Sequence, residues 1–156
     1  MNDIRTFKKE AINKITNSYI KHLESITQDA ETLERCHEDN PELVKSIYRM
    51  STIDMCIKYE SFTAEIIQKL TKWSIEYNRP WAYTRKAAKI LNINIDKEYK
   101  HAHKIWDYYN ALKHVNNKTR FNKLKIKKEL RLDNNRITLE ITHKALNQLL
   151  NKFIIK

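Results

Sequence analysis

Four polar side chains in the second half of the chain are spaced for a single helical stripe, at positions i, i+4, i+7 and i+11: His103, Asp107, Asn110 and His114. A histidine gains or loses a proton near neutral pH, and carboxylate and amide groups can orient it or hydrogen-bond to a phosphate. The stripe therefore predicts acid–base chemistry, with these four residues as candidate catalytic groups. The alternative is a solvated helix face whose polar groups only keep the helix soluble.

The same stripe also offers a metal-binding interpretation, because His103 and Asp107 stand one helical turn apart. A usable site needs more ligands, however, and His101 and His103 point to different sides of a helix. The two cysteines, Cys36 and Cys56, lack the spacing of a zinc knuckle, and a disulfide is not expected inside the cell. We therefore predict no metal and no other cofactor, with Cys56 as a small core residue.

A basic segment directly follows the stripe. Between positions 116 and 136 the chain carries eight lysine and arginine residues against Glu129 and Asp133, so more than half of the net charge of +11 lies there. Such an excess attracts polyanions, which makes nucleic acid the predicted partner class. The alternative is a lysine-rich surface that serves solubility alone. The predicted RNA-binding residues are Lys113, Lys118, Arg120, Lys123, Lys125 and Lys127.

Hydrophobic periodicity predicts two long helices in the first half of the chain. Apolar residues recur at helical spacing from Ile4 to Ile26, which indicates an amphipathic helix of several turns. Asn40 followed by proline and glutamate is a typical helix start, and the second helix is expected to run to about Tyr77. The apolar stripes of the two helices are expected to pack along each other.

Shorter elements are predicted to hold the polar stripe. A helix is expected over 84–91, with Asn92 after it in the left-handed conformation that glycine usually adopts. Asp96 is expected to cap the next helix, whose apolar side includes Trp106 and Tyr109 and whose polar side carries the candidate catalytic residues. The predicted site thus depends on how this one helix sits on the core.

The period of the pattern changes near the end of the chain. Apolar and charged residues alternate over 124–132 and again over 137–141, with the turn-forming Asp133, Asn134 and Asn135 between them, so a β-hairpin is expected. Thr142 is expected to cap a final helix. The predicted fold is mainly α, an antiparallel helical bundle of about five helices with a small β-hairpin before the C-terminal helix. Residues 1–156 are expected to form a single domain.

Composition excludes several classes of protein. The chain has no glycine, which excludes the Gly-rich phosphate loops of P-loop and dinucleotide-binding proteins. No apolar run approaches the roughly 18 residues of a membrane-spanning helix. The first ten residues lack the apolar core of a secretory signal. The sequence therefore predicts a cytoplasmic protein without membrane contact.

A short string at the end of the polar stripe resembles a known signature. Residues 109–114, Tyr-Asn-Ala-Leu-Lys-His, are similar to the Arg-Asn-x-x-x-His motif of HEPN domains. These are helical bundles that include RNA-cleaving toxins and abortive-infection proteins. Asn110 and His114 match the motif, whereas Tyr109 stands in the place of its arginine. The predicted order of helices is also similar over most of the chain.

The resemblance implies a metal-independent endoribonuclease of a toxin–antitoxin or antiviral defence system. The ribose 2′-hydroxyl would attack the adjacent phosphate, with His114 transferring the proton and Asn110 orienting it or the phosphate. Lys113, Lys118 or Arg120 would supply the charge of the missing arginine. The implied partners are RNA, a cognate antitoxin or defence-system protein, and a second copy in a homodimer.

Two further interpretations follow from other features of the sequence. Tyr109 cannot supply the permanent bidentate cation of an arginine, which favours a catalytically degenerate HEPN-like module that binds RNA or a protein. The stretch from Thr84 into the helix after Asp96 is typical of a helix-turn-helix DNA-binding regulator. In that case the side chains facing DNA would be Lys97, Lys100, His101 and Lys104.

Overall fold

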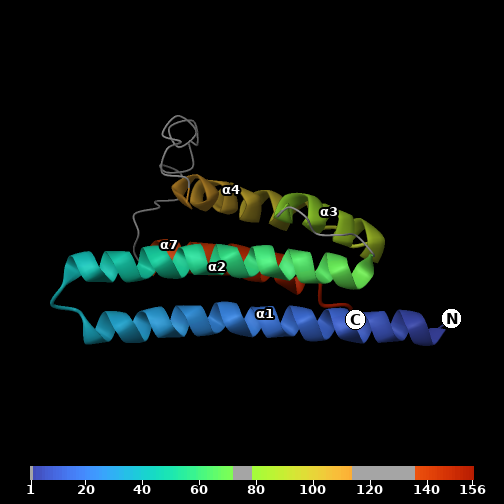
Figure 1. Ribbon diagram of the computed structural model, residues 1–156, viewed down its shortest axis with the longest axis horizontal. Helices are drawn as coiled ribbons and strands as arrows, with labels where there is room; N and C mark the ends of the chain where they lie inside the picture. Colours follow the sequence, from blue (N-terminus) through green and yellow to red (C-terminus); the bar gives the residue numbers. More distant parts are fainter. Residues whose placement is uncertain (1, 72–78, 114–135) are drawn as a thin grey trace.

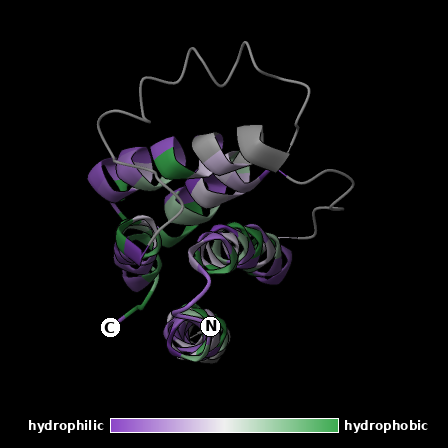
Figure 2. Cartoon of the chain, turned by 90° about the vertical axis from the view of Figure 1, so that its left-hand side faces the viewer, coloured by the Kyte–Doolittle hydropathy of each residue, from purple (hydrophilic) through white to green (hydrophobic). Residues whose placement is uncertain are grey.

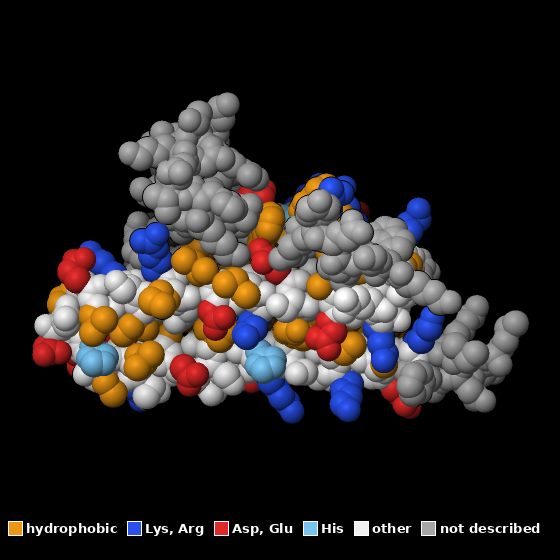
Figure 3. Space-filling view, viewed as in Figure 1, with side chains coloured by type: hydrophobic (Ala, Val, Ile, Leu, Met, Phe, Trp, Pro, Cys, Tyr) orange, Lys and Arg blue, Asp and Glu red, His pale blue; other side chains and the backbone are white. Residues whose placement is uncertain are grey.

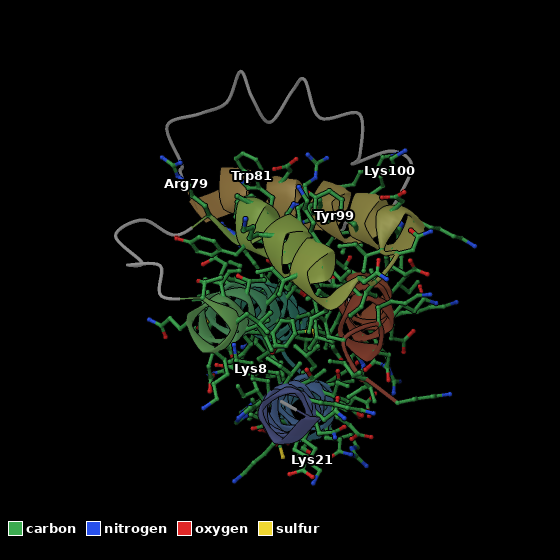
Figure 4. All side chains as sticks on the ribbon, turned by 90° about the vertical axis from the view of Figure 1, so that its right-hand side faces the viewer. Lys8, Lys21, Arg79, Trp81, Tyr99 and Lys100 are labelled. Atoms are coloured by element: carbon green, nitrogen blue, oxygen red, sulfur yellow. The ribbon has the colours of Figure 1, made fainter. Side chains whose placement is uncertain are left out.

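A computed structural model describes residues 2–71, 79–113 and 136–156, and these residues form five α-helices (Figure 1). Helices α1 (Asn2–Cys36) and α2 (Pro41–Leu70) form a long antiparallel pair, and α3 (Pro80–Leu91), α4 (Asp96–Lys113) and α7 (Arg136–Asn151) lie along it. Seen along the bundle, α2 and α7 lie side by side between α1 on one side and α3 with α4 on the other (Figures 2 and 4). The expectation of a mainly helical bundle is therefore confirmed.

Helices α1 (Asn2–Cys36) and α2 (Pro41–Leu70) are joined by a tight turn. Asn40 caps α2 as predicted, because its side-chain oxygen accepts a hydrogen bond from the backbone N–H of Leu43 at 3.2 Å. Helix α2 ends at Leu70, earlier than expected, and residues 72–78 lie outside the described part of the chain. The α1–α2 pair is the scaffold on which the other helices rest.

Helix α2 is the centre of the core, since it contacts each of the other four helices. Its buried side chains occur on nearly every turn, and they include Tyr48, Met55, Tyr59, Phe62 and Ile66. Cys56 is buried among them, as predicted, whereas Cys36 is exposed. This arrangement explains why large side chains are buried along much of α2, because one helix must fill space toward several neighbours.

Helix α3 (Pro80–Leu91) begins four residues earlier than predicted, because Pro80 occupies the first helical position, where a missing N–H is harmless. It ends as predicted, with Asn92 in the left-handed conformation (φ 55°, ψ 50°). The backbone N–H groups of Asn92 and Ile93 donate to Lys89 and Ala88, which satisfies the last carbonyls of α3.

Helix α4 (Asp96–Lys113) starts two residues after Asn94. The cap differs from the prediction, because Asn94 Oδ1 accepts the N–H of Asp96 at 3.2 Å and the carbonyl of Ile95 accepts the first helical bond, from Tyr99. Ile95 thus holds the cap position and Asp96 lies in the first turn, where its charge suits the positive end of the helix.

The predicted β-hairpin is wrong. Its second arm, 137–141, belongs to helix α7 (Arg136–Asn151), which begins well before Thr142, while its first arm, 124–132, lies outside the described residues. Thr138 and Thr142 are fully buried, and Thr142 donates to the carbonyl of Thr138 at 2.8 Å. These threonines occupy core positions of a helix but do not count as apolar residues. The remaining apolar residues therefore show the alternating pattern of a strand.

The residues after α7 are hydrogen-bonded to α1. The side chain of Asn13 donates to the carbonyl of Ile155 at 2.8 Å and accepts from its N–H at 2.7 Å. Phe153 is buried against Phe62 of α2, with ring centroids 5.6 Å apart. Among the described residues, no helix combines the length and apolar character needed to cross a membrane.

Candidate functional site

Helix α4 brings part of the predicted stripe together. His103, Asp107 and Asn110 fall on successive turns of this helix, about 5 Å apart along its axis. The side chains of Asn110 and Lys113 are not described, and His114, Lys118, Arg120, Lys123, Lys125 and Lys127 lie outside the described residues. The structure therefore locates the beginning of the predicted site and not its chemical centre.

His103 is a core residue, with 9% of its surface exposed. Its Nε2 lies 2.8 Å from the hydroxyl of Tyr59 on α2, and that hydroxyl lies 2.5 Å from Oγ1 of Thr84 on α3. The His103 ring stacks on Tyr99, with centroids 4.2 Å apart. The residue therefore ties α4 to both α2 and α3 rather than projecting from the bundle.

The directions of these hydrogen bonds follow from the geometry. Oγ1 of Thr84 lies 2.6 Å from the carbonyl of Pro80, which can only accept, so the hydroxyl hydrogen of Thr84 points there. Thr84 then accepts from Tyr59, and Tyr59 accepts from Nε2–H of His103. This relay fixes the histidine tautomer and gives His103 Nε2, the Tyr59 hydroxyl and the Thr84 hydroxyl each a hydrogen-bond partner.

Burial controls the charge of His103. Desolvation, reinforced by the positive charge of Arg85, lowers the pKa of His103 to about 4. The ring is therefore neutral at neutral pH, which suits a hydrogen-bonding role in the core. A group with this pKa is a poor proton-transfer catalyst near pH 7. Any acid–base chemistry of the stripe would therefore have to be carried out by residues after His103.

The neighbouring residues of α4 face the core to different degrees. Asp107 is half-buried. Trp106 is buried, and its ring N–H donates to the carboxylate of Glu60 on α2 at 3.0 Å. Tyr109, which stands where the motif resembled by residues 109–114 has an arginine, is 0% exposed. An arginine at this point of the helix would be inside the bundle, so the described backbone offers no exposed cation there.

Positive charge is also concentrated on helix α3, which was not predicted as an RNA-binding element. Helices α1 and α2 each carry equal numbers of basic and acidic residues, whereas α3 has Arg85, Lys86 and Lys89 and no acidic residue. Figure 3 shows the balanced character of the α1–α2 side, where red and blue side chains are interspersed. The signal in the sequence that could have revealed it is the presence of three basic residues and no acidic residue over 80–91.

A hollow of about 340 Å³ lies where α3 meets α4. Arg85 and Lys89 from α3 and Tyr99 and Lys100 from α4 line it, together with apolar residues of the turn. The guanidinium of Arg85 lies over the Tyr99 ring, 4.9 Å from its centroid. Within the described ranges no group of three or more His, Cys, Asp or Glu side chains is arranged to hold a metal ion.

Comparisons with family models, with curated proteins and with solved structures find no match to this chain.

Proposed function

We propose that this chain is an RNA-directed protein of the HEPN type, in which Asn110 and His114 form the centre that acts on the phosphate. The proposal rests on the match of these two residues to the Asn-x-x-x-His part of the motif and on the basic segment that follows them. The observation that supports it best is the single helix α4, which carries Asn110 near its end in a bundle of helices. Helical placement is what the four-residue spacing requires.

The reaction proposed for this centre is metal-independent cleavage. A ribose 2′-oxygen would bond to the adjacent phosphorus, the bond from phosphorus to the 5′-oxygen would break, and a 2′,3′-cyclic phosphate and a 5′-hydroxyl would result. His114 would move the proton, and Asn110 would hold His114 or a phosphate oxygen. Lysine and arginine residues from Lys113 to Arg120 would balance the developing negative charge.

A second candidate is an HEPN-like module that binds RNA without cutting it. The burial of Tyr109 favours this alternative, because the position of the motif's cation is filled by a core ring. A lysine from a neighbouring position supplies a point charge, but it does not reproduce the bidentate fork of an arginine. Both candidates share RNA binding and differ only in chemistry.

Cleavage is tested by incubating the protein with a mixed RNA pool, with and without EDTA, and analysing the ends of the products. The enzyme predicts 2′,3′-cyclic phosphates that form in EDTA and disappear with His114→Ala. His101→Ala, an exposed histidine on the same helix, is the matched control and is expected to cleave like the wild type. RNA that is bound and never cut supports the second candidate. Cleavage that His114→Ala leaves unchanged contradicts the assigned centre.

A further inference from the structure

We infer that the outer surface of α3 and α4 is a second RNA-contact surface, which binds single-stranded RNA through Trp81, Arg85, Lys89 and Lys100. This inference rests on the proposed function and adds a surface to it, separate in sequence from Asn110 and His114. We call these four residues the α3–α4 surface.

The residues of α3 are spaced to form one continuous strip. Trp81, Arg85 and Lys89 stand four residues apart, so they follow one another on the helix at intervals of about 6 Å. All three are exposed, and Trp81 has 47% of its surface in contact with solvent. The strip thus presents an aromatic ring, a guanidinium and an ammonium group in succession.

Helix α4 supplies the other side of this surface. Lys100 is exposed, and it lines the hollow where α3 meets α4. Its volume of about 340 Å³ falls within the range of small-ligand pockets, roughly 300–1,000 Å³. A phosphate entering it would meet Arg85, Lys89 and Lys100 from two helices, which is the convergence that backbone binding requires.

The two lysines of this surface are available for a ligand, whereas Arg85 already contacts the Tyr99 ring. Among the described residues, Lys89 and Lys100 form no ion pair, while Glu98, the nearest acidic residue in sequence to Lys100, is engaged with Lys152 at 3.6 Å. Asp96 is the acidic residue that lines the hollow. Three cations against one carboxylate leave a net positive pocket.

The exposed tryptophan favours a single strand over a duplex. A base in a duplex is stacked and paired, whereas an unpaired base can stack on an indole face, and such stacking is tolerant of sequence. Figure 4 shows Trp81, Tyr99 and Lys100 on the side of the bundle formed by α3 and α4, and Lys21 of α1 on the opposite side. The alternation of cation and aromatic ring is typical of grooves that follow single strands.

The first test uses the fluorescence of Trp81, one of three tryptophans in the chain. A 2′-O-methyl oligouridylate lacks the nucleophilic hydroxyl and so is bound without being cut. Stacking on Trp81 predicts quenching of the wild-type protein that is largely lost in Trp81→Phe. Quenching of the same size in Trp81→Phe overturns the role of this ring.

The second test separates this surface from overall charge. The double variant Lys89→Glu, Lys100→Glu is expected to bind the same oligonucleotide at least about tenfold more weakly. The slope of the logarithm of affinity against the logarithm of salt concentration should become shallower by about 1 to 2. The matched control, Lys8→Glu, Lys21→Glu, makes the same change of charge on exposed lysines of α1 and is expected to stay within about threefold of the wild type. Circular dichroism verifies that both variants are folded.

The outcomes of the two tests are distinguishable from those of the proposed function. A wild-type protein that binds no RNA overturns both proposals. A wild-type protein that binds while Lys89→Glu, Lys100→Glu binds equally well overturns only the α3–α4 surface, as does an equal loss in the α1 control. Tighter binding of duplex DNA than of the single strand overturns the choice of ligand and favours the helix-turn-helix interpretation instead.

Discussion

The hydroxyl of Tyr59 lies between Nε2 of His103, at 2.8 Å, and Oγ1 of Thr84, at 2.5 Å, so that one side chain of α2 holds α3 and α4 together. Both helices of the α3–α4 surface are thereby positioned by one buried polar contact. Buried polar networks of this kind stabilise a specific arrangement only while every member is satisfied. Tyr59 therefore helps to fix the position of α3 relative to α4.

Tyr59→Phe is expected to lower the free energy of unfolding by about 1–3 kcal/mol, because it leaves the donor of His103 and the acceptor of Thr84 buried without partners. Chemical denaturation measures the change. Tyr19→Phe removes a hydroxyl that bonds to Glu65 in an exposed position, so it is the matched control and should cost less than about 1 kcal/mol. Equal losses in the two variants would contradict the relay.

Stability is expected to fall with acidification because of His103. Its pKa is lowered to about 4 in the folded protein from 6.5, so the unfolded chain binds the proton more readily. The contribution is fully present above pH 6.5 and is lost as the pH falls from 6.5 toward 4, by up to about 3 kcal/mol. Denaturation midpoints measured across this range test it.

The variant that tests this pH dependence is His103→Gln. Glutamine at 103 keeps an N–H donor toward Tyr59 and cannot titrate, so the slope of stability between pH 4 and 6.5 should become shallower. Burial also lowers the pKa of His143, so part of the dependence of stability on pH should remain in this variant. An unchanged slope in His103→Gln would refute the assignment.

Tyr109→Arg is expected to unfold the protein rather than restore an active motif. The Tyr109 ring is fully buried, and a guanidinium in its place would be a buried charge, at a cost above about 3 kcal/mol. Thermal melts followed by circular dichroism measure it, and Tyr109→Phe, which keeps the ring, is the control. A folded Tyr109→Arg protein with increased RNA cleavage would show that this part of α4 rearranges in the active state.

Asn13→Ala is expected to lower the free energy of unfolding by about 1–2 kcal/mol, since it removes both hydrogen bonds to Ile155 and releases the end of the chain from α1. Asn17 lies one turn further along α1 and is exposed, so Asn17→Ala should change stability by less than about 0.5 kcal/mol. Similar effects of the two substitutions would mean that the contact with Ile155 contributes little.

The helices were predictable where local signals were strong. The Asn40 cap and the left-handed Asn92 follow from short-range chemistry, and both were found as predicted. The start of α7 was missed because Thr138 and Thr142 fill core positions of that helix, and a pattern of apolar residues ignores them. Buried threonines that bond to the carbonyl four residues back are invisible to hydrophobic periodicity.

The site was less predictable than the fold, for a tertiary reason. The spacing of His103 and Asp107 correctly placed both on α4, but whether a stripe faces solvent depends on what packs against it, and here Tyr59 and Tyr99 enclose the histidine. The basic character of α3 was visible in the sequence. The turn at 92–95 brings residues of α3 next to Tyr99 and Lys100 of α4 in one hollow, and this arrangement is seen only in the folded chain.

The proposed binding of RNA is best tested by equilibrium titrations across a series of salt concentrations. Fluorescence anisotropy of a labelled single-stranded oligouridylate, titrated with wild-type protein from 50 to 300 mM KCl, compares it with duplex DNA of the same length. The single strand is expected to bind more tightly than the duplex, and the logarithm of its affinity is expected to fall steeply and linearly with the logarithm of salt concentration. Absence of binding at about 50 mM salt, where such contacts are strongest, would contradict it.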